Sequence, residues 1–322
     1  MKNNTFEEIA GVLSASEKVL IFPHVNMDGD ALGSAAALCR GLRKIGKECY
    51  VLIEDDIPFN LEFLDKGYCT KDKNIIAHAD VSVCVDCGDT GRFEKRKEKF
   101  AQAPVSVCID HHATTEFFCE VNYVEPAAAA TGELIFRLLK TMGIEIDCDI
   151  AESLYAAITT DTGNFQYSNT TVETHLIAAE LCALGINPGD ISIEIYENAR
   201  IEKLLLEAAA LRTMTTLSGG KGVIAYVTQE MLKETGARSD ETEGIVQKLR
   251  SIAGVEVAAL MKETDDGRIK VSMRSKKYVD VAEIAAGFSG GGHVRAAGCT
   301  FYCGLTEAFD KLKEKITDSL EI

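Results

Sequence analysis

Histidine and aspartate side chains are concentrated in four short stretches of this 322-residue chain: "HVNMDGDALGS", "VDCGD", "IDHH" and "ITTDTGNF". In chain order the residues are His24, Asp28, Asp30, Asp86, Asp110, His111, His112 and Asp161. Carboxylates that converge without lysine or arginine beside them repel one another strongly. A pair of divalent cations would remove that repulsion, so the pattern indicates metal chemistry.

The ligand types narrow the choice of metal. Carboxylates and imidazoles favour manganese over a soft metal, although zinc, iron or cobalt can bind the same set. Two cations roughly 3.5–4 Å apart share a bridging carboxylate and lower the pKa of a bound water, which is the arrangement used to hydrolyse phosphate esters. We therefore predict two divalent cations, with Mn²⁺ as the expected metal.

Each of these residues also has a structural explanation when it is taken alone. His24 could be a buried structural histidine, and Asp30 could cap the helix that follows it. Asp86 lies inside "CVDC", but no second C-x-x-C supports a zinc cluster, and strand alternation would point Cys84 and Cys87 to opposite faces. The complete set of residues favours metal binding over these separate explanations.

Short apolar runs precede most of these residues. "KVLIFPH" (18–24), "VSVCVD" (81–86) and "VSVCID" (105–110) end in the candidate ligands, and "ALGSAAALCRGLRKIG" has a helical composition. Continuous apolar strands that alternate with helices predict a parallel sheet buried on both faces. Ligands bind outside the carboxyl ends of such strands.

The pattern changes along the chain. Residues 127–216 are predicted to be mostly helical, "LSGGKG" is a glycine-rich break, and strands alternate with helices beyond it. "TDDG" between "VEVAALMKE" and "RIKVSMRS" predicts a hairpin. We predict an α/β fold with a parallel-sheet catalytic domain (1–190), a helical connector (191–216) and a smaller α/β substrate-binding domain (217–322).

Charge and composition exclude some classes of protein. The net charge is −16, and the first 216 residues carry most of it, with 34 acidic and 19 basic residues against 16 and 15 in the remainder. Such acidity argues against binding of long nucleic acid through its phosphates. No apolar run is long enough to cross a bilayer, and the eleven cysteines are scattered. We expect a cytoplasmic protein with reduced thiols and no membrane contact.

A glycine-rich stretch, "SGGGHVRAAG" (289–298), lies in the second domain. It lacks the third glycine of a dinucleotide fingerprint, because Arg295 stands at that position. Consecutive glycines let backbone amides approach a phosphate, as in an anion-binding nest at a helix start. Arg274 in "VSMRS" offers a planar fork suited to phosphate. The alternative is a flexible loop.

The motifs "HVNMDGDALGS", "VDCGD", "IDHH", "ITTDTGNF" and "GGGHVRAAG" together resemble those of the DHH–DHHA1 phosphoesterases, of the short nanoRNase and pAp-phosphatase type. The resemblance extends over essentially the whole chain. Many relatives have proline just before the second candidate ligand of the first motif, Asp28, where this chain has Met27. The resemblance implies that His24, Asp28 and Asp86 bind one cation. It further implies that the second cation is bound by Asp30, Asp86, His111 and Asp161.

The resemblance also implies roles around the substrate. Asp110 would orient a histidine, and His112 would face the scissile phosphate. The expected substrate-binding residues are Asn26, Arg274, Ser275, Gly290, Gly291, Gly292 and His293. The expected reaction is in-line attack on phosphorus by metal-activated water. Short oligoribonucleotides would give mononucleotides, and 3'-phosphoadenosine 5'-phosphate (pAp) would give AMP.

Other functions remain open at the level of sequence. A phosphodiesterase of cyclic dinucleotides or their linear products would use the same ligands, and only the substrate pocket would differ. An inorganic pyrophosphatase would not be expected to carry G-G-G-H, and a nucleotide-binding sensor would be expected to lack a metal ligand. A nuclease for long strands would need additional domains. The helices between 171 and 216 would suit a homodimer interface, or packing within the chain.

Overall fold

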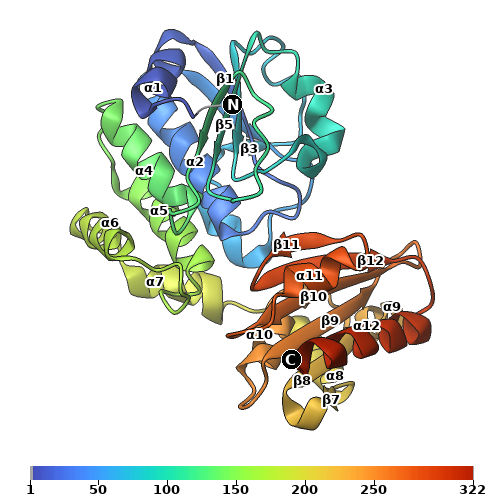
Figure 1. Ribbon diagram of the computed structural model, residues 1–322. Helices are drawn as coiled ribbons and strands as arrows, with labels where there is room; N and C mark the ends of the chain where they lie inside the picture. The colour runs from blue at the N-terminus through green and yellow to red at the C-terminus, as the bar shows by residue number, and fades with distance from the viewer. Residues whose placement is uncertain (1–2, 322) are drawn as a thin grey trace. The chain divides into compact units, whose positions relative to one another are not determined.

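The computed structural model describes residues 3–321, and the chain divides into two compact units after Asn198 (Figure 1). The division falls inside the stretch predicted to be a connector, 191–216. Helix α8 (Ile201–Arg212) lies in that stretch, yet Leu206 and Ala210 of α8 are buried in a core of the second unit. This helix is therefore part of the second unit, because its apolar residues have a sheet to pack against.

The first unit contains a six-stranded sheet in which every pair of neighbours is parallel. Its elements are α1 (Phe6–Ala15), β1 (Lys18–Phe22), α2 (Gly29–Lys44), β2 (Glu48–Leu52), η1 (Phe59–Leu64), β3 (Cys69–Thr70), β4 (Val81–Val85), η2 (Thr90–Arg96), α3 (Lys97–Phe100), β5 (Val105–Asp110), β6 (Val121–Val124), α4 (Thr131–Thr141), α5 (Cys148–Asp161), α6 (Val172–Ala183), α7 (Pro188–Ser192) and η3 (Ile193–Glu197). The predicted parallel sheet is confirmed.

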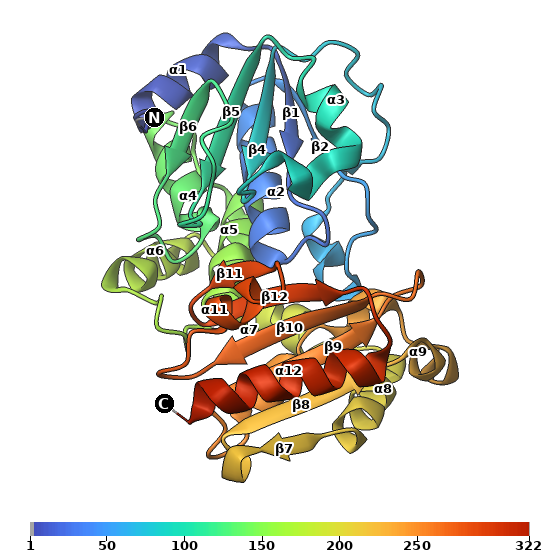
Figure 2. The ribbon, with the colours of Figure 1, turned by 45° about the vertical axis from the view of Figure 1, so that its right-hand side comes forward.

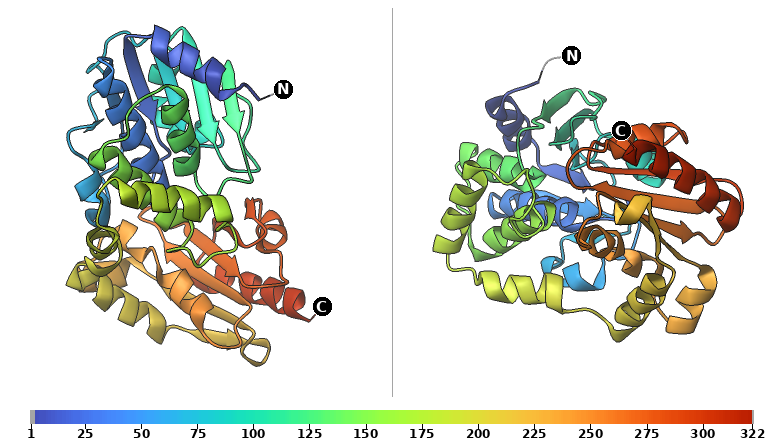
Figure 3. Two further views of the ribbon diagram at one scale, coloured as in Figure 1. Left: turned by 90° about the vertical axis from the view of Figure 1, so that its left-hand side faces the viewer. Right: turned by 60° about the horizontal axis from the view of Figure 1, so that its bottom comes forward.

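Both faces of this sheet are covered. Along β1, Val19 and Ile21 point into the core that contains α1, α2, α4 and α5, whereas Leu20 and Phe22 point into a second core under η2 and α3. Figure 2 shows α3 on one side of the strands and α2, α4 and α5 on the other, and Figure 3 shows α1 beside α4. Burial on both faces explains why these strands are continuously apolar.

The strand order, β3-β2-β1-β4-β5-β6, reverses direction between β1 and β4. From β1 the chain moves outward to β2 and β3, and from β4 it moves outward the other way to β5 and β6. The loops after β1 and β4 therefore diverge at the carboxyl edge of the sheet. This switch point is where open α/β sheets bind their ligands.

Close packing fixes α2 against α5. A Cβ atom at Gly29 would collide with the Thr160 side chain, and one at Gly33 would collide with the Ser153 carbonyl oxygen. Glycine at these two positions lets the two helices approach closely. The packing matters for the site, because α2 carries Asp30 and α5 ends at Asp161.

The second unit contains a mixed six-stranded sheet of order β11-β12-β10-β9-β8-β7. After α8 its elements are β7 (Thr215–Leu217), η4 (Ser218–Gly220), β8 (Gly222–Val227), α9 (Gln229–Thr235), η5 (Ser239–Thr242), α10 (Ile245–Ser251), β9 (Val257–Glu263), β10 (Ile269–Ser275), α11 (Val281–Ala286), β11 (Gly291–His293), β12 (Ala296–Phe301) and α12 (Leu305–Leu320). Strands β9 and β10 are antiparallel, so the hairpin predicted at "TDDG" is confirmed.

Helices α11 and α12 pack on one face of this sheet, as Figure 2 shows for α12. Helices α8, α9 and α10 pack on the other face, over β8 and β9. Strands β10 and β12 bury only one face. Ile269, Val271 and Met273 are buried, and the residues between them, Lys270 and Ser272, are exposed.

Among the described residues, no single helix is long and apolar enough to span a membrane. One sharply bent pair, Val172–Ala183 with Pro188–Glu197, meets the length and composition criteria together.

Candidate active site

The structure brings all eight predicted metal-binding and tuning residues together at the switch point of the first sheet. Their places are as follows: His24 follows β1, Asp28 is the N-cap of α2, Asp30 lies in its first turn, Asp86 follows β4, Asp110 ends β5, His111 and His112 follow it, and Asp161 ends α5. They come from five elements that the sheet topology places side by side. Three overlapping groups within this set lie close enough together to hold a cation. One of them consists of Asp86, His111 and His112, and its His112 ring is bonded to Asp110 through Nδ1. The other two groups are described first.

The first group consists of His24, Asp28 and Asp86. The Nε2 atom of His24 lies 3.5 Å from an oxygen of Asp86 and 3.7 Å from an oxygen of Asp28. The Nδ1 atom of His24 is 2.7 Å from the carbonyl oxygen of Val25, which can only accept. Nδ1 therefore carries the proton of the neutral ring, and Nε2 presents its lone pair to the two carboxylates.

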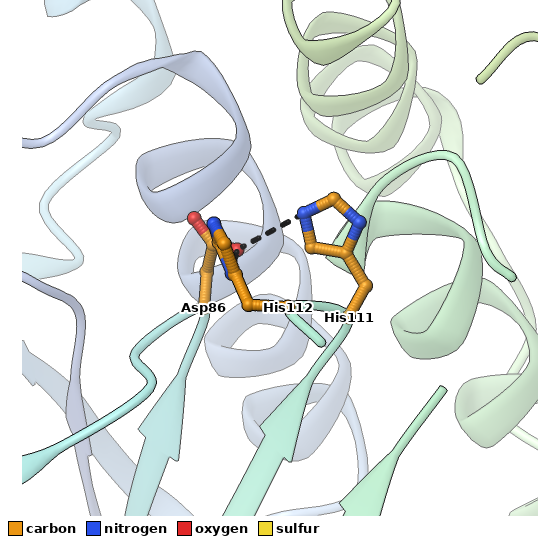
Figure 4. Close-up of side chains that lie close together, drawn as sticks. All are labelled: Asp86, His111 and His112. Atoms are coloured by element: carbon orange, nitrogen blue, oxygen red, sulfur yellow. Dashed lines mark ion pairs between the residues drawn. The ribbon is translucent and has the colours of Figure 1, made fainter. Parts of the chain in front are cut away.

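The second group consists of Asp30, His111 and Asp161. The Nε2 atom of His111 lies 3.8 Å from Asp30, 3.7 Å from Asp86 and 3.6 Å from Asp161. Its Nδ1 atom is 3.1 Å from the Ala128 carbonyl oxygen, so this ring has the same tautomer as His24. Figure 4 shows Asp86 and His111 at the ends of neighbouring strands, with their ion pair dashed.

Asp86 connects the two groups. Its Oδ2 atom faces His24, and its Oδ1 atom faces His111. These nitrogen–oxygen separations exceed those of ordinary hydrogen bonds and leave room for a cation bound to both atoms at about 2.0–2.2 Å. The donor set and its spacing therefore fit two divalent cations with one carboxylate between them.

Electrostatics supports the same fit. Within residues 3–321, every ion pair of these carboxylates is made to a histidine, and none to lysine or arginine. Burial, together with the charge of Asp86, raises the pKa of Asp30 well above its usual range. Burial, with Asp28 and Asp86, raises the pKa of Asp161 to about 7. Bound cations would replace the protons that this crowding otherwise favours.

The backbone at Asp86 is also unusual. This residue is 2% exposed and has a φ of +54°, in the left-handed region that side-chain-bearing residues rarely adopt. Such a conformation costs about 1–2 kcal/mol and persists only where its surroundings enforce it. Here it turns the carboxylate at the end of β4 toward both histidines.

Thr131, at the start of α4, holds two of the candidate ligands. Its backbone N–H donates to Asp30 at 2.7 Å, and its hydroxyl donates to Asp86 at 2.8 Å. The backbone N–H of Gly132 donates to Asp30 as well, at 2.9 Å. Asp30 thus caps α4 from another helix, and its negative charge lies at the positive end of the α4 dipole.

Thr131 is not among the site residues predicted from the sequence. The signal that could have found it is the residue before it, Ala130, which is the N-cap of α4 and has no side chain able to accept from the helix. A buried helix start without a capping side chain needs an acceptor from elsewhere in the chain. The sequence does not show that this acceptor is Asp30.

Asp110 holds His112. The carboxylate of Asp110 is fully buried and accepts from His112 Nδ1 at 2.8 Å, from the His111 N–H at 2.8 Å and from the Thr115 hydroxyl. The ring of His112 is about one-third exposed, with 34% of its side-chain surface accessible. With Nδ1 bound to Asp110, Nε2 is the ring nitrogen that can act on a substrate.

Asn26, in the loop between β1 and α2, is exposed and has a φ of +52°. Its backbone N–H donates to Asp55 at 2.9 Å. Asn26 lies in the same loop as His24 and precedes Asp28, the N-cap of α2.

The predicted substrate-binding residues of the second unit do not all share one face. Arg274, Ala296 and His293 stand in one cross-strand row of β10, β12 and β11, so their side chains share the face opposite α11 and α12. Ser275 is on the opposite face and buried, and its hydroxyl donates to the Val279 carbonyl oxygen at 2.7 Å. Ser275 thus braces the loop that follows β10.

The predicted helix-start nest at residues 290–293 is wrong. Residues Gly291–His293 form the edge strand β11, which follows the end of α11 and pairs with β12. A Cβ atom at Gly290 would collide with the Gly298 carbonyl oxygen, and one at Gly292, where φ is +143°, would collide with the Ala296 carbonyl oxygen. These glycines are needed for the close approach of two strands. Their outward edge still presents backbone groups to a ligand.

A metal-ligand site at the switch point of a parallel sheet, followed by a smaller mixed-sheet unit, is the architecture expected for a DHH phosphoesterase. Comparison with protein families agrees. Residues 18–158 match the DHH family, N-terminal domain, and residues 219–321 match the DHHA1 domain. The chain belongs to the DHH family, with a DHHA1 domain as its second unit.

Particular relatives extend over almost the whole chain. The bifunctional oligoribonuclease and PAP phosphatase NrnA of Thermus thermophilus is 32% identical over 97% of this chain and 93% of its own length. The protein of the same name from Bacillus subtilis is 26% identical over 92% and 93%. An exopolyphosphatase-related protein from Bacteroides fragilis has the same fold, with a TM-score of 0.90, 29% identity and coverage of 98% of this chain and 97% of its own.

Proposed function

We propose that this protein is a two-metal phosphoesterase that hydrolyses short oligoribonucleotides to mononucleotides and pAp to AMP and phosphate. The observation that carries the proposal is the pair of ligand groups joined by Asp86, at the switch point of the first sheet. The names of the full-length relatives, oligoribonuclease and PAP phosphatase, support the choice of substrates.

His24, Asp28 and Asp86 would hold one cation, and the second would be held by Asp30, Asp86, His111 and Asp161. Manganese suits this hard, mixed oxygen and nitrogen donor set. When bound, the two cations would neutralise phosphate charge and lower the pKa of water. The protein's own contribution is to hold six ligand side chains on five elements in positions that need little rearrangement.

His112 would act on the substrate phosphate. Asp110 holds its Nδ1 proton, which fixes the ring orientation and presents Nε2 outward. A ring in this position can donate to a phosphate oxygen or protonate the leaving oxygen, which stabilises the charge that develops as the ester bond breaks. Asn26 would add a contact from the β1–α2 loop.

The second unit would bind the remainder of the substrate. Arg274 can pair with phosphate through its planar guanidinium group, and His293 lies on the same sheet face. The glycine strand 290–292 would contribute backbone amides. Ser275, being buried, would support this surface through the loop it braces and would not itself contact the substrate.

The acidity of the protein limits the substrate to a few phosphates, because a long duplex needs extended basic surface for binding. We therefore propose that short oligoribonucleotides (nanoRNA) and nucleotide bisphosphates are its substrates and that long duplexes are not bound. We also propose that the protein acts in the cytoplasm without a membrane.

The test is a panel of substrates with Mn²⁺: a ribodinucleotide, a long RNA, pAp, a cyclic dinucleotide and pyrophosphate. Asp161→Asn serves as the control, because it keeps the side-chain shape and removes one ligand charge. Turnover of the dinucleotide and pAp by wild type alone would support the proposal. Preference for the cyclic dinucleotide would assign the same site to another substrate. No turnover of any member would leave a nucleotide-binding protein.

A further inference from the structure

The second unit has a charged face that the predicted site residues do not account for. Strand β10 alternates buried Ile269, Val271 and Met273 with Lys270, Ser272 and Arg274, so these three polar side chains point to one face. Helices α8, α9 and α10 cover the neighbouring strands β8 and β9 on this face. Helix α10 also contacts β10, and Lys270 and Ser272 of β10 remain exposed on this face.

Lys270 lies at the far end of this face from Arg274. The two residues are four positions apart along the strand, which is about 13 Å, too far for both cations to contact a single phosphate. Lys262 of β9 is directly opposite Lys270 in the register, and it donates to the Ser239 carbonyl oxygen at 3.1 Å. Among residues 3–321, Lys270 forms no ion pair with a carboxylate. This end of the face therefore has positive charge available for an anion.

A pocket of about 340 Å³ adjoins Lys270, and its lining includes Phe288, Gly290, Thr300 and Tyr302. By strand alternation Thr300 and Tyr302 share the face of Lys270, since Lys270 is directly opposite Thr300 in the register. Tyr302 is 82% exposed, so one of its ring faces is open for stacking. The volume is at the lower end of the range for small-ligand pockets.

We propose that this pocket is a second nucleotide subsite, which binds the part of an oligoribonucleotide beyond the nucleotide held at Arg274. Lys270 contacts a phosphate there, and Tyr302 stacks on a base. Cationic side chains beside an open aromatic ring are the features by which proteins bind single-stranded nucleic acid without reading its sequence. The subsite rests on the proposed function, and it makes substrate length the property that the second unit measures.

The test compares kcat/KM for pAp, a dinucleotide and a tetranucleotide in Lys270→Ala and Tyr302→Ala proteins. We expect about a tenfold loss for the tetranucleotide, which is the loss typical of one stacked base or one phosphate contact, and unchanged values for pAp and the dinucleotide. Lys313→Ala is the matched control, because Lys313 is an exposed lysine on α12, over the opposite face of the sheet. Unchanged pAp hydrolysis also shows that each variant is folded.

Equal losses on all three substrates, or a tetranucleotide loss no larger than that of Lys313→Ala, would overturn the subsite. Binding of a labelled tetranucleotide to chelator-treated protein separates this outcome from failure of the proposed function. If wild type hydrolyses nothing, the proposed function is wrong. The subsite would still be supported if Lys270→Ala bound the tetranucleotide about tenfold more weakly than wild type and the salt dependence of binding fell by about one phosphate contact. Binding equal to that of wild type would contradict it.

Discussion

At the scale of single residues, one carboxylate has the central position. Asp86 is buried, has a left-handed backbone and faces a histidine of each ligand group. The hydroxyl of Thr131 donates to the Asp86 carboxylate, and the backbone N–H of Thr131 donates to Asp30. Partners of this kind typically change metal affinity by 10–100-fold when they are removed.

We predict that Thr131→Val weakens Mn²⁺ binding by about 10–100-fold, measured by calorimetric titration of chelator-treated protein. Valine has nearly the shape of threonine and keeps the N–H that Asp30 accepts, so only the bond to Asp86 is lost. Thr131→Ser is the control, because it retains the hydroxyl and should bind Mn²⁺ nearly as wild type does. Wild-type affinity in Thr131→Val would show that the hydroxyl does not position Asp86.

Asp110→Asn should lower kcat for pAp by about 10²-fold or more while Mn²⁺ affinity stays close to that of wild type. An amide at this position no longer fixes the proton of His112 on Nδ1, and the ring loses its orientation. If Asp110 acts through His112, the double variant with His112→Gln should be no slower than His112→Gln alone. Additive losses would assign Asp110 a separate role.

The residues at strand ends could be predicted from the sequence, and those that support them could not. His24, Asp86 and Asp110 follow apolar runs, and parallel strands bring such ends to one edge, so their convergence follows from the chain itself. Asp161 lies at the end of a helix, so the convergence of strand ends does not by itself place it beside the other ligands. The role of Thr131 depends on which helix start lies against Asp30, and this is decided by packing between segments about 100 residues apart.

At the scale of elements, the contact between α2 and α5 sets the separation of two candidate ligands. Gly29 and Gly33 let α2 approach α5, which holds Asp30 near Asp161. A side chain at either position would push the two helices apart.

We predict that Gly33→Ala destabilises the first unit by about 1–3 kcal/mol, measured by urea unfolding, because its Cβ would meet a backbone carbonyl that cannot move away. Gly11→Ala is the matched control. Gly11 lies in the exposed part of helix α1 with open space around its Cβ position, so alanine should stabilise by about 0.5–1 kcal/mol. Equal stability of the two variants would mean that α2 and α5 tolerate separation.

The glycine run at 290–292 shows where element prediction fails. Three glycines leave the backbone almost unrestricted, so local sequence is compatible with a nest, a loop or a strand. The strand forms because β12 supplies a partner whose backbone is close enough to exclude a Cβ atom at Gly290 and Gly292. Likewise α8 has the composition of a connector helix, and its packing on the apolar face of β8 makes it part of the second unit.

At the scale of the whole molecule, charge is divided between the units. The first 216 residues carry most of the negative charge, and the second unit is nearly neutral with cations on one sheet face. Metal binding should therefore stabilise the first unit alone. At 100 times its dissociation constant, one Mn²⁺ adds about 2.7 kcal/mol of stability.

Hydrogen exchange read by mass spectrometry can locate this effect in the intact protein. We expect Mn²⁺ to slow exchange in peptides from 18–161 and to leave those from 222–301 unchanged. The same experiment on Asp86→Asn should show little response in either part. Slower exchange across both units of wild type would indicate that metal binding couples them.

The most direct test of the central claim is pAp and dinucleotide hydrolysis by chelator-treated protein over a series of Mn²⁺ concentrations, with Asp86→Asn beside wild type. We predict no turnover without metal, recovery of wild type as Mn²⁺ is added, and a loss of about 10³-fold or more in Asp86→Asn at every concentration, because the shared ligand has lost its charge. Metal-independent turnover by wild type, or wild-type rates in Asp86→Asn, would contradict the two-metal account.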